Sequence, residues 1–183
     1  MNLANKLTMF RIILVPFFVA AMAFSQHLAA LIIFAVASLT DMLDGKVARK
    51  YNMITDFGKF LDPLADKVLV IGALLCMVEL HYTAAWLVWV IVAREFMVSG
   101  IRLVAAGSKE KIVIAANIWG KAKTVLQMVT IILYFFAAAL APADAIGMVQ
   151  LCGNVLCWLV AAVTLLSGVI YLWQNRACFM QAK

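Results

Sequence analysis

The amino-acid sequence predicts an all-α integral membrane protein with six transmembrane helices and both termini on the cytoplasmic side. Of its 183 residues, 67% are hydrophobic and only 13% are charged, and the mean hydropathy is +1.04. Soluble domains are usually about 45–50% apolar and about 25% charged, so most of this chain must face lipid. A segment in hydrocarbon has to satisfy its own backbone hydrogen bonds, and the apolar stretches lack the alternating pattern of a barrel strand. Transmembrane helices are the remaining fold class.

The first two helices come from one long stretch, residues 12–40, that contains no Asp, Glu, Lys or Arg. A span needs about 20 apolar residues, so this stretch is too long for one span and too short for two. We therefore expect a turn at residues 25–27, and we expect each of the two helices to extend beyond the charged residues at its outer end. The expected helices are 7–24 and 28–49.

The other four helices form two further pairs. Polar residues 79–82 separate the third helix from the fourth, and Pro142 and Asp144 separate the fifth from the sixth. The charge-free stretches on either side predict these four helices, at 60–78, 84–106, 119–140 and 146–174. An even number of spans places both termini on the same side of the membrane.

Basic residues give the orientation. All fifteen fall on one side of this layout or in the helix halves nearest to it. The three opposite turns contain no Lys or Arg, and their acidic and histidine side chains are His27, Glu79, His81 and Asp144. By the positive-inside rule, the basic side and both termini are cytoplasmic. The net charge of +6 is therefore one-sided, which suits anionic headgroups and phosphorylated substrates.

No repeat, low-complexity tract or soluble segment interrupts the chain, so we expect a single membrane-embedded domain over residues 1–183. The four cysteines form no C-x-x-C pair, and three of them lie in apolar spans, which indicates packing rather than disulfide bonding. The composition excludes an ordinary cytosolic enzyme, a secreted disulfide scaffold and a disordered tail.

Four aspartates lie at the cytoplasmic ends of the second and third helices: Asp41, Asp44, Asp62 and Asp66. At 100° per residue, the first pair shares a helix face about 140° wide with Gly45, Ala48 and Arg49. The second pair shares a face about 80° wide with Gly58. Four like charges crowded at the membrane edge repel one another unless cations lie between them. The spacing therefore predicts a metal site.

The ligand types indicate which metal and which substrate. Carboxylates without His or Cys suit a hard divalent ion, Mg²⁺ or Mn²⁺, and four of them suffice for one ion or two. The small residues Gly45, Ala48 and Gly58 leave room for a nucleotide or diphosphate, and Arg49 offers a guanidinium beside this gap. Pro63 disfavours helical geometry at the residue before it and can distort this phasing. The alternative is an interfacial belt in which the aspartates only pair with neighbouring Lys and Arg.

The run from Asp41 to Asp66 reads D-x2-D-G-x2-A-R-x8-G-x3-D-x3-D over 26 residues, without substitution. It resembles the signature of the CDP-alcohol phosphotransferases, six-helix membrane enzymes in which a hydroxyl attacks the diphosphate of a CDP-activated lipid or alcohol and releases CMP. The resemblance implies that Asp41, Asp44 and Asp62 are metal ligands. It implies that Asp66 is both a metal ligand and the catalytic general base.

The resemblance also implies the substrate-binding residues. The residues expected beside the CDP diphosphate are Gly45, Ala48, Arg49, Gly58 and, from the first helix, Thr8. A phosphorylated acceptor needs fixed cations, and the candidates are Lys59, Arg102, Arg94, Lys121 and Lys123, of which Lys59 and Arg102 are favoured. Two of these have alternative roles, because Arg94 can form a buried structural pair with Glu95 and Arg102 can snorkel to the headgroups.

Four short segments resemble bacterial family members that use glycerol 3-phosphate as the acceptor: 2–11, 62–67, 93–102 and 120–128. One departure is Ala4, where relatives often carry Pro. This resemblance implies transfer of the phosphatidyl group of CDP-diacylglycerol to sn-glycerol 3-phosphate, at the cytoplasmic face of a bacterial inner membrane. It also implies contacts with membrane lipids, a homodimer and no nucleic-acid partner. The alternatives are another acceptor, such as inositol phosphate, serine, choline or phosphatidylglycerol, a divalent-cation transporter, or a catalytically silent scaffold.

Overall fold

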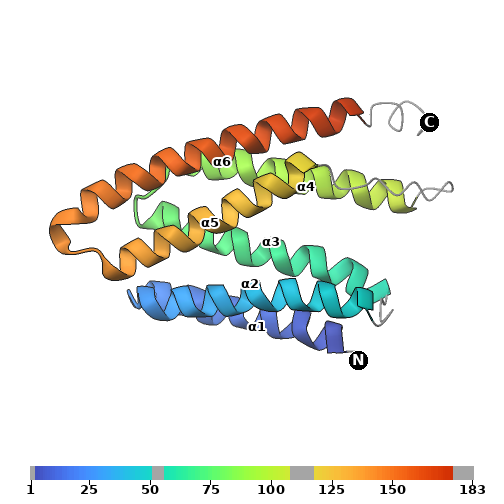
Figure 1. Ribbon diagram of the computed structural model, residues 1–183, viewed down its shortest axis with the longest axis horizontal. Helices are drawn as coiled ribbons and strands as arrows, with labels where there is room; N and C mark the ends of the chain where they lie inside the picture. Colours follow the sequence, from blue (N-terminus) through green and yellow to red (C-terminus); the bar gives the residue numbers. More distant parts are fainter. Residues whose placement is uncertain (1–2, 51–55, 108–117, 175–183) are drawn as a thin grey trace.

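A computed structural model of the chain describes residues 3–50, 56–107 and 118–174, and within these ranges the regular structure is entirely helical (Figure 1). The elements are α1 (Leu3–Ala23), α2 (His27–Lys50), α3 (Asp56–Glu79), α4 (Ala85–Gly107), α5 (Ile118–Leu140), a short 3₁₀ helix η1 (Ala143–Ala145) and α6 (Ile146–Gln174). The predicted all-α fold is confirmed.

The helix bounds agree closely with those expected from the charge-free stretches. α1 begins at Leu3 rather than at residue 7, and α3 begins at Asp56 rather than at residue 60. The other bounds lie within one residue of the expected ones. Both helices therefore have polar residues ahead of their apolar part. A helix can extend beyond the hydrocarbon edge because its backbone hydrogen bonds are made within the helix. α3 also stays helical on both sides of Pro63.

Helix length and surface composition identify a membrane protein. α1, α5 and α6 each contain a segment long and apolar enough to cross a membrane, whereas the apolar part of α2 is shorter, His27–Asp41. Large apolar side chains point outward, including Phe17, Trp89 and Trp173, which are 60%, 70% and 68% exposed. Such a surface is stable only against lipid. The count of six spans stays a prediction, because α3 and α4 carry charged residues along their length.

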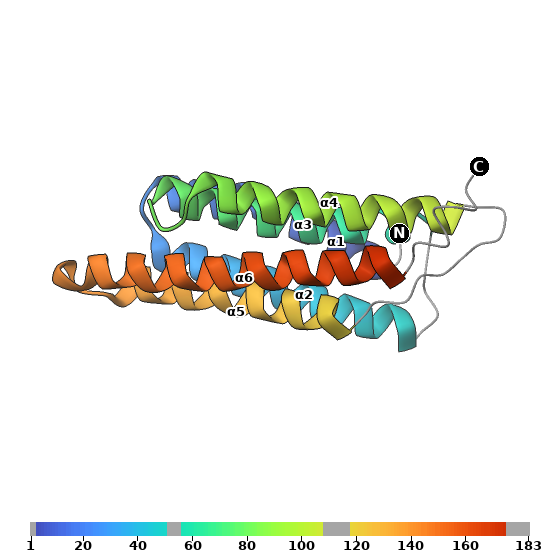
Figure 2. The same ribbon diagram turned by 90° about the horizontal axis from the view of Figure 1, so that it is seen from above.

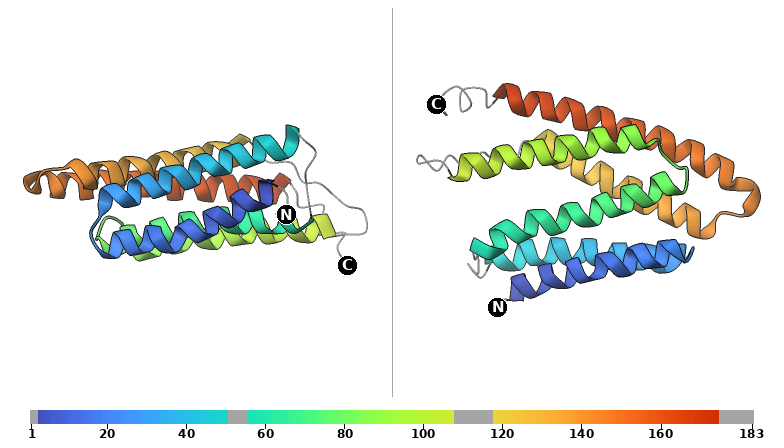
Figure 3. Two further views of the ribbon diagram at one scale, coloured as in Figure 1. Left: turned by 90° about the horizontal axis from the view of Figure 1, so that it is seen from below. Right: turned by 180° about the vertical axis from the view of Figure 1, so that it is seen from behind.

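The six helices form two layers of three, seen edge-on in Figure 2 and from two further sides in Figure 3. One layer holds α1, α3 and α4, and the other holds α2, α5 and α6. Between the layers, the rings of Phe18, Phe34 and Phe135 from α1, α2 and α5 are fully buried, with centroids 5.5–6.4 Å apart. This aromatic cluster joins the first hairpin to the fifth helix.

Two of the hairpin turns close in the same way. Ser25 and His81 take the left-handed conformation, with φ of 56° and 60°. In the first turn, the amide of Ser25 donates to the Met22 carbonyl at 2.9 Å, and the amide of Gln26 donates to the Ala21 carbonyl at 2.8 Å. The turn at His81 repeats this pattern. These bonds satisfy the last carbonyls of α1 and α3, in a motif that usually places glycine at the left-handed position.

Several helix ends lie together at one end of the bundle. The end of α2, the starts of α1 and α3 and the ends of α4 and α6 all lie toward one end of the bundle (Figure 1). At the opposite end, the α5–α6 hairpin projects beyond its neighbours (Figure 1). There the Tyr134 hydroxyl donates to the Val149 carbonyl at 3.1 Å. A Cβ atom on Gly153 would lie only 1.4 Å from a ring carbon of Tyr134, so the close approach of α5 to α6 requires glycine.

Candidate active site

The first aspartate of the motif is held by an arginine from α1. Asp41, at the end of the apolar part of α2, forms an ion pair with Arg11, whose Nη1 atom lies 2.7 Å from the Asp41 Oδ1 atom. The Arg11 side chain is completely buried, whereas that of Asp41 is 43% exposed. Thr8, three residues earlier on the same helix, is also completely buried. The site therefore includes a buried cation from α1 that the sequence did not assign to binding or catalysis.

The last aspartate of the motif lies close to charges from four helices. Asp66, on α3, is near enough to Asp41, Lys67, Glu95 and Arg11 for their charges to act on its carboxylate. Two of the four predicted metal ligands are thus brought together from α2 and α3. The other two, Asp44 and Asp62, lie in the last turns of α2 and the first turns of α3. Their side chains lie outside the described part of the structure, as do those of Gly45, Ala48, Arg49, Gly58 and Lys59.

The chemistry of the donor set fits a hard divalent cation. Asp41 and Asp66 offer only carboxylate oxygens, which Mg²⁺ and Mn²⁺ prefer. Among the side chains that the structure describes, no three Asp, Glu, His or Cys residues gather closely enough to hold a metal ion. A complete coordination shell therefore needs Asp44 or Asp62 in addition, as the spacing of the motif predicts.

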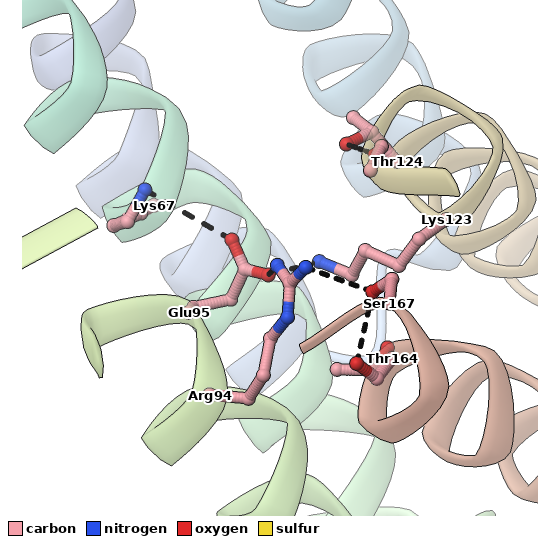
Figure 4. A network of polar contacts seen from close by, with 8 residues as sticks. Lys67, Arg94, Glu95, Lys123, Thr124, Thr164 and Ser167 are labelled. Carbon is pink, nitrogen blue, oxygen red and sulfur yellow. Dashed lines mark hydrogen bonds and ion pairs between the residues drawn. The ribbon is translucent and has the colours of Figure 1, made fainter. Parts of the chain in front are cut away.

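A second set of charges lies deeper in the bundle, around Glu95 of α4 (Figure 4). Lys123 of α5 donates a hydrogen bond to Glu95 Oε1. Arg94 Nη1 donates to the same oxygen at 3.1 Å, and Lys67 Nζ lies 3.9 Å from Oε2. Arg94 is nine residues from the start of α4, about 14 Å along the helix axis. One carboxylate thus contacts three cations from three helices, α3, α4 and α5.

The network continues into α6 (Figure 4). Arg94 Nη2 donates to the Ser167 hydroxyl at 2.8 Å, and that hydroxyl donates to the backbone carbonyl of Thr164 at 2.9 Å. Arg94 and Lys123 are only 8% and 3% exposed. The buried Arg94–Glu95 pair that the sequence allowed is therefore present. It is part of a larger assembly that joins α3, α4, α5 and α6.

A pocket lies between α3, α4 and α5, and it is lined by Asp66 and by three members of the Glu95 network, Lys67, Glu95 and Lys123. Its empty volume, including the open mouth, is about 380 Å³. Its polar wall consists of Asp66, Lys67, Glu95, Lys123, Thr124 and Gln127. Its apolar wall consists of Val70, Ile71, Leu74, Ile91, Val92 and Met128. The pocket therefore brings a predicted catalytic carboxylate into the same space as buried cations.

The remaining predicted cations lie elsewhere. Arg102, on α4, is exposed and stacks over the Tyr171 ring of α6 with its guanidinium carbon 5.3 Å from the ring centroid. Lys121 is exposed on α5. Neither lines the pocket. Of the acceptor-phosphate candidates whose side chains are described, Lys123 lines the pocket and Arg94 joins it through Glu95.

Sequence reasoning missed three residues of this region. Arg11, Lys67 and Gln127 were not assigned to substrate binding or catalysis, although all three lie beside or in the pocket region. The sequence feature that could have identified Lys67 is its position next to Asp66. The feature that could have identified Gln127 is its four-residue spacing from Lys123, which places both side chains on one helix face.

Comparison with known proteins gives a consistent result. Residues 1–172 match the family model described as CDP-alcohol phosphatidyltransferase. The chain is 47% identical over 145 residues to a Bacillus subtilis protein named CDP-diacylglycerol–glycerol-3-phosphate 3-phosphatidyltransferase, an alignment that covers 71% of this chain and 74% of that protein.

Two further relatives carry the same name. The Escherichia coli K12 protein is 37% identical over 182 residues, and the alignment covers 96% of each chain. The Rickettsia felis protein is 33% identical over 180 residues, with 97% of this chain and 95% of that protein covered. The similarity therefore extends over all six helices.

Proposed function

Because the chain belongs to the CDP-alcohol phosphatidyltransferase family, we propose that it transfers the phosphatidyl group of CDP-diacylglycerol to sn-glycerol 3-phosphate. The products are phosphatidylglycerophosphate and CMP, so the reaction belongs to phospholipid biosynthesis. The names of the relatives support glycerol 3-phosphate over the other acceptors that the sequence left open. The whole chain acts as one membrane-embedded domain.

The observation that carries this proposal is the composition of the pocket between α3, α4 and α5. Asp66 supplies a carboxylate, and Lys67 and Lys123 supply cations, on the wall of one pocket. The acceptor carries a phosphate at one end and the attacking hydroxyl at the other. A pocket with a proton acceptor and fixed cations matches both ends of such a molecule.

The charge balance of the pocket supports an anionic acceptor. Lys67, Arg94 and Lys123 surround Glu95, so the network has a formal charge of +2 before Asp66 is counted. A phosphate monoester carries about −1.5 to −2 near neutral pH. Binding the phosphate beside Lys123 and Arg94 would offset this excess in a region with little access to water. Lys59, Arg102 and Lys121 are left as cations that attract phosphorylated substrates toward the bundle end.

The residues of the chain have separate roles in the transfer. The acceptor hydroxyl attacks the phosphorus that carries diacylglycerol, a new P–O bond forms, and the P–O bond to CMP breaks. Asp66 accepts the proton of the attacking hydroxyl. Arg11 holds the Asp41 carboxylate in position on the opposite side of the site. Gly45, Ala48, Arg49 and Gly58 border the cytidine diphosphate, and Thr8 lies beside Arg11 on α1.

Members of the family use divalent metal ions. We infer that Asp41, Asp44, Asp62 and Asp66 hold one or two Mg²⁺ or Mn²⁺ ions. When bound, such an ion neutralises the diphosphate and stabilises CMP as the leaving group. The carboxylate donor set supports this assignment, because oxygen ligands favour these hard cations.

We propose that the active site faces the cytoplasm from a bacterial inner membrane and that all six helices span the bilayer. The one-sided distribution of Lys and Arg supports this orientation. CDP-diacylglycerol then reaches the site laterally, with its acyl chains in lipid. The proposal includes a homodimer, which cross-linking in native membranes would test.

The direct test is CMP release by the purified chain. CMP should appear only when CDP-diacylglycerol, glycerol 3-phosphate and Mg²⁺ or Mn²⁺ are all present, and serine, inositol phosphate or phosphatidylglycerol should not replace glycerol 3-phosphate. Asp66→Asn should lower the rate by at least about 100-fold, the usual lower limit for loss of a general base. Asp144→Asn, an equivalent change at the exposed opposite end, should leave it unchanged. Full activity of Asp66→Asn would disprove the assigned role.

A further inference from the structure

Gln127 has a buried side-chain amide nitrogen without a hydrogen-bond partner in the described part of the structure. It lies on α5, is only 3% exposed, and its Nε2 atom has no hydrogen-bond partner among the described atoms. Leaving a buried donor unpaired is unfavourable, so native structures usually pair such groups with protein, water or a ligand. The family motif and the proposed mechanism give this amide no role. Its position therefore points to a partner that arrives from outside the chain.

The pocket supplies the direction from which this partner comes. Gln127 lines the same pocket as Asp66, Glu95 and Lys123. It is four residues from Lys123 on α5, so the two side chains lie one turn apart on the same face of the helix. A molecule bound between Asp66 and Lys123 therefore lies next to the Gln127 amide.

We propose that Gln127 is a specificity-determining residue that donates a hydrogen bond from Nε2 to the second hydroxyl of the acceptor. This inference rests on the proposed function, in which the acceptor is a phosphorylated polyol. Its phosphate binds near Lys123 and Arg94, and its attacking hydroxyl points to Asp66. The remaining hydroxyl lies between these two ends. Gln127 and Thr124 are the neutral polar side chains on the pocket wall, and the Thr124 hydroxyl already donates to the Gly120 carbonyl at 3.0 Å, which leaves the Gln127 amide as the donor for the acceptor.

The chemistry of the group favours a hydroxyl over the phosphate. The cations of the network already match the charge of a phosphate. An amide adds no charge, but it discriminates strongly between a ligand with a hydroxyl and one without, because the second ligand leaves the donor unpaired. Gln127 thus distinguishes a phosphorylated polyol from a phosphorylated simple alcohol.

The test compares two acceptors. 3-Hydroxypropyl phosphate has the same phosphate and the same attacking hydroxyl as glycerol 3-phosphate but lacks the hydroxyl between them. For the wild-type chain, kcat/KM should favour glycerol 3-phosphate by about 5- to 150-fold, the range for one unpaired buried donor. Gln127→Met should lower kcat/KM for glycerol 3-phosphate by a similar factor and leave that of the analogue unchanged. The preference should then disappear, while the KM for CDP-diacylglycerol stays the same.

A control and a stability measurement separate this role from a structural one. Thr130 lies three residues further along α5, is 2% exposed, and its hydroxyl also has no described partner, but it does not line the pocket. Thr130→Val should keep the full preference for glycerol 3-phosphate. Gln127→Met should unfold at the wild-type temperature or above it, since it removes an unpaired polar group. Gln127→Leu provides a second apolar replacement should the first variant fold poorly.

The outcomes distinguish this inference from the proposed function. An active wild-type chain whose preference survives Gln127→Met, or a variant that loses activity equally with both acceptors, would overturn the role of Gln127 alone. A wild-type chain that releases no CMP with glycerol 3-phosphate would overturn the proposed function and this inference with it.

Discussion

Replacing Glu95 by Gln should destabilise the protein strongly, because it leaves three cations without their shared counter-charge. Glu95 accepts from Lys123 and from Arg94 at 3.1 Å, and Lys67 lies 3.9 Å away. The Glu95 side chain is 18% exposed, and those of Lys123 and Arg94 are 4% and 9% exposed, so water screens the pairs little. Removing one partner of a buried ion pair costs about 3–5 kcal/mol, and the partial exposure of Glu95 favours the lower value.

A loss of about 3 kcal/mol corresponds to a decrease of about 6–12 °C in the melting temperature of a chain of this size. Thermal unfolding in detergent micelles, followed by tryptophan fluorescence, measures this change. Glu79→Gln is the matched control, since Glu79 is exposed at the opposite end of α3, and its melting temperature should change by less than about 2 °C. Equal melting temperatures for the two variants would refute the role of the network.

A double variant makes the test more specific. Combining Glu95→Gln with Lys123→Met removes both charges of the closest pair, so less unpaired charge remains in the bundle than in Glu95→Gln alone. The double variant should therefore lose less stability than the two single variants together, by about 1 kcal/mol or more. Additive losses would show that the two side chains do not interact.

Two further predictions follow from close contacts. Gly153→Ala should lower stability by about 1–3 kcal/mol, because the new methyl group would overlap the Tyr134 ring, whereas Gly147→Ala, with no atom within 4 Å, should be neutral or stabilising in the same melting assay. Arg11→Met should lower the rate of CMP release by about 10- to 150-fold through loss of the ion pair with Asp41, and Arg11→Lys should restore part of it. A fully active Arg11→Met variant would show that Asp41 needs no such support.

The helices were predictable because their signal is local. Charge-free stretches located all six, and their bounds agree with the structure except at the starts of α1 and α3. The polar turn residues Ser25 and His81 lie where the sequence placed breaks, and their left-handed conformation closes the helices. Each of these features depends on a few neighbouring residues and on the need to satisfy backbone hydrogen bonds within lipid.

The pairing of charges was not predictable in the same way. Lys123 and Glu95 are 28 residues apart in the chain, and Arg94 and Ser167 are 73 apart. Whether two such side chains meet depends on the rotation of each helix about its own axis and on which neighbouring helix it packs against. The sequence favoured Arg102 over Lys121 and Lys123 as a ligand of the acceptor phosphate, yet of these three residues only Lys123 lines the pocket.

The sequence alone determined that this is a membrane protein and where its helices begin and end, and it predicted that the four motif aspartates gather at the ends of two neighbouring helices. Composition, charge-free length and spacing along a helix are enough for those conclusions. Only the tertiary structure decided that Arg11 reaches Asp41 and that Glu95 collects Lys67, Arg94 and Lys123. It also decided that Gln127 faces the same pocket as Asp66. The physical reason is that side chains from different helices meet through packing, and packing depends on the shapes of all six helices at once.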